Sequence, residues 1–172
     1  MFKKLTVLSL GLQLLFVQSA YAISQNNGFI EFKPYFSPIT EINKAKIVLV
    51  LKERKLYLYE DNKISKVFSV AIGKSGWRTP TGNFKIIDKI MNPAWTNFKT
   101  GKIVKPGKNN PLGSRWLEFY KVPNTPDSIG FHGTSDLNSI GKDASHGCVR
   151  MYPKDVEFLY DFVDIGTSVK VI

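Results

Sequence analysis

Residues 46–72 read KIVLVLKERKLYLYEDNKISKVFSVAI and contain three β-prone runs separated by charged turns. Apolar, β-branched and aromatic side chains dominate each run, as is typical of strands. The runs lie at 47–51, 56–59 and 67–72, and the turns contain Lys52-Glu53-Arg54 and Glu60-Asp61-Asn62. Short strands joined by short polar turns predict an antiparallel meander.

The rest of the chain adds more strand than helix. Further strand candidates lie at 83–87, 116–120, 129–132 and 169–172. One helix is predicted from Pro153, a residue that suits a first helical turn. The apolar side chains that would share one face of it are Val156, Leu159, Tyr160 and Val163. The fold class is therefore predicted to be mainly β.

Residues 91–114 form a long connection that is rich in Pro, Gly, Asn and Lys. A connection of this length without secondary structure is often a functional lid or a binding wall. Trp95, Phe98 and several lysines could line such a wall. The other interpretation is a surface loop whose aromatic side chains pack on the sheet.

The chain begins with the features of a secretory signal peptide. Lys3 and Lys4 precede an apolar run over 5–17, and the small-residue tripeptide Ala20-Tyr21-Ala22 follows. The apolar run is shorter than the roughly 20 residues that a membrane-spanning helix requires. We expect cleavage after Ala22, which predicts an exported protein of the periplasm or cell wall without a transmembrane anchor. Lipoprotein anchoring needs a Cys at the cleavage site, and the only Cys is Cys148.

Cleavage would divide the chain into a signal peptide at 1–22, a lead-in segment at 23–45 and one domain at 46–172. A hydrophobic content of 43% is enough for one core. The loss of Lys3 and Lys4 lowers the formal charge from +10 to +8. Export disfavours nucleic acid as a partner and leaves anionic envelope polymers, or a charge that serves only solubility.

Cys148 is the residue that most needs an explanation, because one Cys cannot form an internal disulfide and an exposed thiol is open to oxidation. A buried core Cys is the structural alternative. The sequence around it, Ser145-His146-Gly147-Cys148-Val149-Arg150, is polar and contains a glycine. Gly147 permits a sharp turn that brings main-chain N–H groups near the sulfur, where they could stabilise an oxyanion.

A thiol that attacks a carbonyl needs a nearby base or positive charge. Both His residues of the chain, His132 and His146, lie within sixteen positions of Cys148. Their spacing does not select one of them as the base, and a structural hydrogen bond is the alternative role of each. Two His and one Cys could also bind zinc, but no carboxylate or second Cys has a tight ligand spacing to them. Sortases also carry His, Cys and Arg in this order, with different surroundings of the Cys.

The segment from His132-Gly133-Thr134 to Ser145-His146-Gly147-Cys148-Val149-Arg150 resembles the signature of L,D-transpeptidases. Three upstream elements also look like this family. They are Ala71-Ile72-Gly73-Lys74 with Thr79-Pro80-Thr81-Gly82-Asn83-Phe84, then Asn92-Pro93-Ala94-Trp95, then Asn110-Pro111-Leu112-Gly113. The resemblance implies that 46–172 is an L,D-transpeptidase catalytic domain, a β-sandwich-like fold of two mixed sheets with one or two short helices.

The resemblance also implies a role for each site residue. Cys148 would be the nucleophile and His132 the base, oriented by the Gly133 carbonyl. Ser145 and His146 would support the site, and main-chain N–H groups of His146, Gly147 and Cys148 would form the oxyanion hole. Arg150 would bind a substrate carboxylate, with a salt bridge to an acid such as Asp143 as the structural alternative.

The implied substrates are peptidoglycan stem peptides, as donor and acceptor. Cys148 would attack the carbonyl of the third stem residue at the L-centre of meso-diaminopimelate, expel D-alanine and form a thioester, which an amine acceptor then resolves into a cross-link. This chemistry needs no metal or organic cofactor. Hydrolytic members of the family carry the same motifs and use water instead, as carboxypeptidases, amidases or endopeptidases. A non-enzymatic wall-binding domain is the third hypothesis, although it would not need the Cys and His set.

Overall fold

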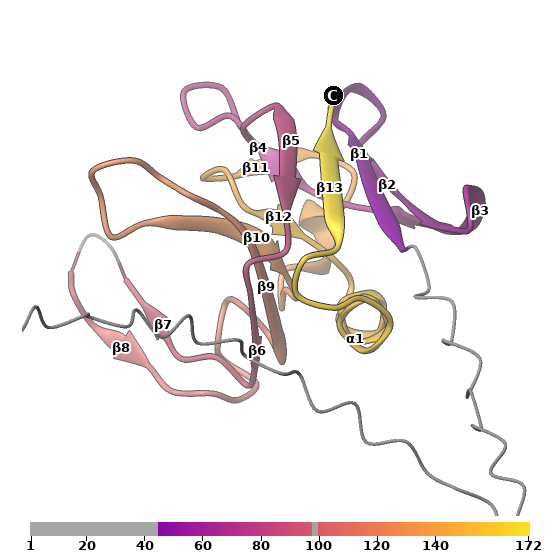
Figure 1. Ribbon diagram of the computed structural model, residues 1–172. Helices are drawn as coiled ribbons and strands as arrows, with labels where there is room; N and C mark the ends of the chain where they lie inside the picture. The colour runs from indigo at the N-terminus through magenta and orange to yellow at the C-terminus, as the bar shows by residue number, and fades with distance from the viewer. Residues whose placement is uncertain (1–44, 98–99) are drawn as a thin grey trace, which may run out of the picture. The chain divides into compact units, whose positions relative to one another are not determined.

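The computed structural model describes residues 45–97 and 100–172 (Figure 1). Most of the regular structure in these residues is β, with a single α-helix and two 3-10 helices. The elements in chain order are β1 (Lys46–Val50), η1 (Leu51–Glu53), β2 (Lys55–Glu60), β3 (Lys63–Ser69), β4 (Ile72–Gly73), β5 (Gly82–Lys85), β6 (Asp88–Met91), β7 (Trp95–Thr96), β8 (Ile103–Val104), β9 (Arg115–Lys121), β10 (Ser128–His132), η2 (Leu137–Ser139), β11 (Asp143–Ser145), β12 (Val149–Arg150), α1 (Pro153–Phe162) and β13 (Ser168–Val171).

The larger sheet has five strands in the order β3-β2-β1-β13-β5. Strands β1, β2 and β3 pair antiparallel, so the predicted meander is confirmed. Strand β13 pairs parallel with β1, which makes the sheet mixed. Alternate side chains of β1, Ile47 and Leu49, are fully buried, as are Leu56 and Leu58 of β2. One face of this sheet therefore covers the core.

The second sheet has four strands in the order β12-β10-β9-β6. It is also mixed, because β10 pairs parallel with β12 and antiparallel with β9. Leu117 and Phe119 of β9 and Phe131 of β10 are buried and belong to the hydrophobic core. The rings of Phe119 and Phe131 lie 4.8 Å apart. The predicted mainly β fold of two mixed sheets is thus confirmed.

Helix α1 begins at Pro153, as predicted. Pro suits this position because the N–H that it lacks would have no partner inside the helix. Val156 and Leu159 are fully buried, and Val163 is buried just after the helix ends. Truncation of Leu159 to Ala would therefore cost about 2–5 kcal/mol of stability.

Residues 91–114 contain more regular structure than their composition predicts. Strands β7 and β8 pair antiparallel and form a short hairpin within the segment. The buried amide of Asn110 closes its far end by donating to the carbonyl of Pro93 at 2.8 Å. Phe98, which was expected to line a wall here, lies outside the described residues.

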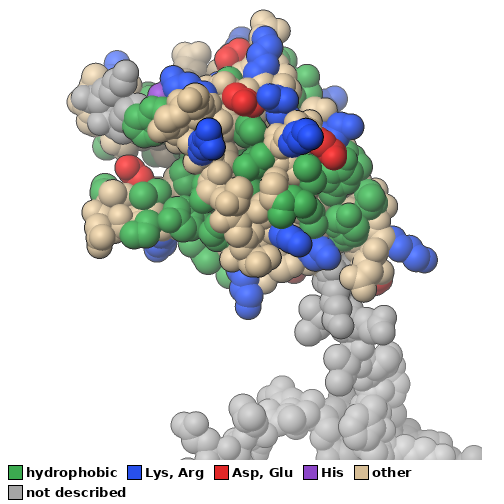
Figure 2. Space-filling view, turned by 90° about the horizontal axis from the view of Figure 1, so that it is seen from above, with side chains coloured by type: hydrophobic (Ala, Val, Ile, Leu, Met, Phe, Trp, Pro, Cys, Tyr) green, Lys and Arg blue, Asp and Glu red, His purple; other side chains and the backbone are tan. Residues whose placement is uncertain are grey.

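The predicted signal peptide (1–22) and the lead-in segment (23–45) lie outside the described residues, except for Ala45. Within residues 45–97 and 100–172, no helix has both the length and the apolar character needed to span a membrane. Figure 2 shows Lys and Arg side chains spread over one face of the molecule, with fewer Asp and Glu side chains between them.

Candidate active site

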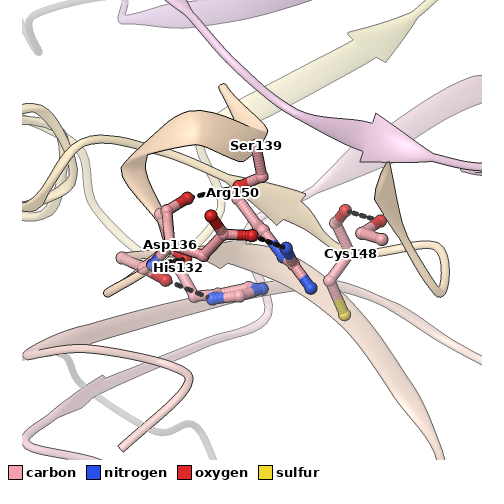
Figure 3. A network of polar contacts seen from close by, with 8 residues as sticks. His132, Asp136, Ser139, Cys148 and Arg150 are labelled. Carbon is pink, nitrogen blue, oxygen red and sulfur yellow. Dashed lines mark hydrogen bonds and ion pairs between the residues drawn. The ribbon is translucent and has the colours of Figure 1, made fainter. Parts of the chain in front are cut away.

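The parallel pairing of β10 with β12 brings the two halves of the sequence motif together. Phe131 pairs with Val149, and His132 pairs with Arg150. Cys148 directly precedes β12, and its Sγ lies 3.7 Å from the Ser128 carbonyl oxygen at the start of β10. Figure 3 shows the side chains of Cys148, Arg150 and His132 projecting from these neighbouring strands into the same region.

His132 is buried at the end of β10, and its Nδ1 lies 2.6 Å from the Gly133 carbonyl oxygen. A carbonyl only accepts hydrogen bonds, so Nδ1 carries the hydrogen and Nε2 of the neutral ring has a free lone pair. Burial, together with the positive charge of Arg150, lowers the pKa of His132 to about 4, against hydrogen bonds to the Gly133 and Pro111 carbonyls that act in the opposite direction. The imidazole is therefore a neutral acceptor at neutral pH.

Cys148 is partly buried and packs against the hydrophobic core. Burial raises the pKa of the Cys148 thiol, and the negative charge of Asp127 adds to this rise. A backbone hydrogen bond from Gly130 and the positive charge of Arg150 act in the opposite direction. The resting sulfur is therefore a thiol at neutral pH, and its attack on a carbonyl requires a base to remove the proton.

The turn that carries Cys148 is held by the Ser145 hydroxyl. Ser145 Oγ donates to the Cys148 carbonyl at 2.5 Å and accepts from the Gly147 N–H at 3.1 Å. Gly147 has a φ of 112°, a conformation that side chains with a Cβ rarely adopt. The Gly147 N–H, expected in an oxyanion hole, is thus used within the turn. The Cys148 N–H has no acceptor among the described residues.

Thr79 joins this turn to the loop that follows β4. Its hydroxyl donates to the Gly147 carbonyl at 2.8 Å and accepts from the Gly73 N–H at 3.0 Å. The side chain is buried, so no water replaces these bonds. The same loop carries Trp77, whose ring meets the His146 ring edge to face at a centroid distance of 4.9 Å. The exposed His146 side chain therefore packs against this loop.

Arg150 pairs with a different acid from the one expected. Its Nη1 lies 3.5 Å from Asp136 Oδ2, while Asp143 binds the guanidinium of Arg54 at 2.7 Å. The salt bridge that was the structural alternative for Arg150 thus forms, with Asp136 as the acid in place of Asp143. Asp143 lies on β11, which pairs with β4 rather than with the second sheet, and this places its carboxylate near Arg54. The Arg150 side chain remains one-quarter exposed beside the site.

The backbone behind His132 is packed against the end of segment 91–114. A Cβ on Gly113 would lie only 3.0 Å from Gly133 Cα, so only glycine permits this approach. Asn110 is 1% exposed and fixes the approach: its Oδ1 accepts from the Leu112 N–H at 2.8 Å. The position of the Gly133 carbonyl, and with it the His132 ring, thus depends on the Asn110 turn.

Sequence reasoning assigned no role to four residues that shape this site: Thr79, Asn110, Trp116 and Asp136. Thr79 and Asn110 belong to two of the quoted upstream motifs, and membership of these motifs was the signal that could have identified them as residues of the site. The Trp116 ring lies 6.0 Å from the His132 ring, because β9 pairs Trp116 with His132. Nothing in the sequence marks Trp116 or Asp136 as neighbours of the site.

Among the described residues, no group of three His, Cys, Asp or Glu side chains is arranged to hold a metal ion.

The chain is similar in sequence to curated proteins that are named as L,D-transpeptidases. The chain is 34% identical over 125 residues to "Putative L,D-transpeptidase YqjB" of Bacillus subtilis (strain 168), over 73% of this chain and 69% of that protein. It is 29% identical over 140 residues to "Probable L,D-transpeptidase ErfK/SrfK" of Escherichia coli (strain K12), over 73% of this chain and 43% of that protein. The chain thus spans less than half the length of the second relative.

Solved structures share the fold. The C442S mutant of Enterococcus faecium L,D-transpeptidase superposes with a TM-score of 0.62 at 22% identity, over 76% of this chain and 50% of that one. An L,D-transpeptidase from Mycobacterium smegmatis superposes with a TM-score of 0.61 at 19% identity, over 76% of this chain and 59% of that one. Residues 44–171, most of the chain, match the family described as the L,D-transpeptidase catalytic domain. This chain therefore belongs to the L,D-transpeptidase family.

Proposed function

We propose that this domain is a peptidoglycan L,D-transpeptidase in which Cys148 forms an acyl-enzyme thioester with a tetrapeptide stem. The observation that carries the proposal is the Nδ1 contact of His132 with the Gly133 carbonyl at 2.6 Å. This contact leaves Nε2 as the proton acceptor of a neutral imidazole, next to a strand that carries a neutral thiol. A buried neutral base beside a thiol is the arrangement that general-base activation requires.

The first half-reaction forms the thioester. His132 Nε2 takes the thiol proton as Sγ bonds to the carbonyl carbon of the third stem residue. The negative charge that develops on the carbonyl oxygen is then stabilised by the Cys148 N–H. The C–N bond to the terminal D-alanine breaks, and the leaving amine takes the proton from His132. Every proton that leaves the sulfur thus ends on D-alanine.

The second half-reaction regenerates the thiol. An uncharged amine of a neighbouring stem attacks the thioester carbon and loses a proton to His132 Nε2. The C–S bond then breaks, and the sulfur takes that proton back. The product is an amide link between third residues, and attack by water instead of the amine would give a shortened stem.

Thr79 supports the choice of the Cys148 N–H as the oxyanion donor. Gly147 C=O and Cys148 N–H belong to one planar trans peptide, in which the two bonds point in opposite directions. The hydroxyl of Thr79 holds the carbonyl on one side, so the Cys148 N–H points to the other side. Arg150, which is one-quarter exposed, is the proposed group for a stem carboxylate.

Export to the periplasm or cell wall, with cleavage after Ala22, is part of the same proposal, since the proposed substrate lies outside the cytoplasmic membrane. We also assign anionic envelope polymers as partners. A hollow of about 730 Å³ behind the Thr79 loop supports this assignment, because Lys52, Arg54 and Arg78 line it together with only one acid, Asp143.

The deciding experiment incubates the mature domain with purified tetrapeptide muropeptides and identifies the products by mass. Dimers linked between third residues, together with free D-alanine, are the expected result. Tripeptide monomers alone, or cleavage of existing links, would replace the transferase with a hydrolase.

A further inference from the structure

Glu118 of β9 is a buried carboxylate that the proposed reaction does not use. The residue is 8% exposed, and its Oε1 is buried without a hydrogen-bond partner. A buried oxygen of an ionisable group that lacks a partner is costly and rare in folded proteins. Its presence therefore calls for a ligand that supplies the missing donor.

The strand register places Glu118 on the face of the sheet that carries the site. Trp116 and Glu118 are two positions apart in β9, so their side chains share a face. Trp116 pairs with His132 and its ring lies 6.0 Å from the imidazole, so this face is the one that bears the base. Glu118 pairs with Gly130, whose backbone contacts the Cys148 thiol.

The Trp116 indole lies against Gly130, the residue that pairs with Glu118. A Cβ at Gly130 would lie 2.5 Å from the Leu117 carbonyl and 2.9 Å from the Trp116 ring, so no side chain fits there. The indole of Trp116 therefore forms an apolar surface over Gly130, the residue that pairs with Glu118 and contacts the Cys148 thiol.

The side chain opposite Glu118 in the neighbouring strand β6 is another acid, Asp88. Arg150 and Asp127 both act on Cys148, with opposite charges. The Asp88 carboxylate already accepts from the Lys89 N–H at 2.7 Å, and Lys89 itself reaches to the Val163 carbonyl. No ion pair to Glu118 forms within the described residues. Like charges opposite one another destabilise a sheet unless a cation lies between them.

We propose that Glu118, with Asp88 beside it, binds the primary ammonium of a diamino residue in the donor stem. An ammonium can supply the hydrogen-bond donor that Glu118 Oε1 lacks. An ammonium has no free lone pair, so the bound group is a side-chain amine of the donor and not the amine that attacks the thioester. Glu118 is then a specificity-determining residue, and the assignment rests on the proposed function.

The test compares two donor stems that differ only in the side-chain amine of the third residue, free or N-acetylated. Wild-type enzyme should release D-alanine from the free amine with a kcat/KM about ten-fold or more above that for the acetylated stem. Glu118→Gln keeps the shape of the side chain and removes its charge. The variant should lose this preference through a raised KM for the free-amine stem, while its kcat/KM for the acetylated stem should equal that of the wild type. Asp61→Asn, an exposed change of the same charge, should behave as the wild type.

Acylation of Cys148 by a carbapenem without a cationic group distinguishes a failure of the proposed function from a failure of the ammonium site. If wild type fails both this acylation and D-alanine release, the proposed function is wrong. If it turns over both stems equally, or if Glu118→Gln keeps the preference, only the ammonium site is wrong. If acetylation matters on the acceptor and not on the donor, the assignment to the donor is wrong. Should Glu118→Gln not fold, as judged by its carbapenem rate, Asp88→Asn must reduce the preference instead.

Discussion

Thr79 and Gly147 lie 68 positions apart in the chain, yet the Thr79 hydroxyl donates to the Gly147 carbonyl at 2.8 Å. The bond connects the loop after β4 to the turn that carries Cys148. Because the Gly147 carbonyl and the Cys148 N–H share a planar peptide, one hydroxyl sets the direction of the proposed oxyanion donor. The Gly73 N–H in turn holds that hydroxyl at 3.0 Å, so the bond has a defined geometry.

Thr79→Val removes the hydroxyl and keeps the shape of the side chain. It leaves the buried Gly73 N–H and Gly147 carbonyl without partners, which should cost about 1–3 kcal/mol of unfolding free energy. The rate of Cys148 acylation by a carbapenem should fall further than this loss of stability explains, because the Cys148 N–H can rotate. Urea unfolding and intact-mass kinetics measure the two effects.

Two controls accompany this variant. Thr79→Ser keeps the hydroxyl and should acylate at close to the wild-type rate, while Thr81→Val, at an exposed position, should change neither quantity. Equal acylation rates for Thr79→Val and the wild type would disprove the orienting role.

The catalytic assignment predicts an order of losses among three variants. Cys148→Ala should give no adduct and no turnover, because the thiol supplies the covalent step. His132→Ala should reduce acylation by about 10²-fold or more, since the base acts together with the nucleophile. His146→Ala should cost less, because His146 packs against Trp77 outside the turn. A larger loss for His146→Ala than for His132→Ala would reverse the choice of base.

Thiol alkylation and chelation test the same assignment against zinc chemistry. Activity should disappear on alkylation of Cys148 and survive a strong chelator. Loss of activity with the chelator and its return on addition of zinc would contradict the cysteine mechanism.

The strands were predictable where alternation alone determines them. Ile47 and Leu49 alternate with half-exposed residues, and this pattern marks β1 without any knowledge of the fold. The parallel pairings of β1 with β13 and of β10 with β12 were not predictable, because they join segments distant in sequence with no short turn between them. Strands β7 and β8 have two residues each, too few for a periodic pattern.

The sequence could name candidate site residues, but it could not predict their contacts. The motif around Cys148 named the side chains, but the partner of Arg150 depends on where β11 and η2 lie in space. Asp143 is nearer to Arg150 in sequence than Asp136 is, and it nevertheless binds Arg54. Glu118 gave no signal, because one acidic residue in a strand becomes informative only when its burial and its neighbours are known.

The lowered pKa of His132 predicts a loss of stability in acid. The folded value of about 4 lies below the unfolded value of 6.5, so the unfolded chain binds the proton more readily. The contribution is complete above pH 6.5 and is lost as the pH falls towards 4. The resulting loss of unfolding free energy between about pH 7 and about pH 4.5 should be about 2 kcal/mol. Urea unfolding of the wild type and of His132→Gln at both pH values should show this difference.

His146→Gln is the control for this measurement and should retain the pH dependence of the wild type. If His132→Gln lost stability in acid as steeply as the wild type, the buried neutral imidazole would not be its source.

The hollow lined by Lys52, Arg54 and Arg78 predicts a salt-sensitive affinity for anionic envelope polymers. The double variant Lys52→Ser/Arg78→Ser should bind purified wall fragments more weakly than the wild type at low salt. Lys121→Ser/Lys154→Ser removes the same charge from exposed positions elsewhere. Co-sedimentation should separate the two variants, and the separation should vanish at high ionic strength. Equal losses would mean that net charge, and not this hollow, attracts the polymer.

We predict that the segment that packs behind His132 determines whether an amine or water resolves the thioester. Transfer requires that an uncharged amine reaches the acyl-enzyme and that water, which is far more concentrated, does not. The two ends of segment 91–114 are held together by Asn110, whose amide nitrogen lies 2.8 Å from the Pro93 carbonyl and 3.4 Å from the Val104 carbonyl. The same turn brings Gly113 against Gly133.

Asn110→Ala removes these bonds without shortening the segment. The hairpin β7–β8 should then lose its anchor, and products from tetrapeptide substrate should shift from dimers towards tripeptide monomers. Carbapenem acylation should change less, because it precedes the competition between amine and water. Asn109→Ala is the matched control, since Asn109 is the exposed neighbour of the buried Asn110. Mass analysis of the products gives the ratio directly, and a dimer fraction equal in all three proteins would show that this segment does not protect the thioester.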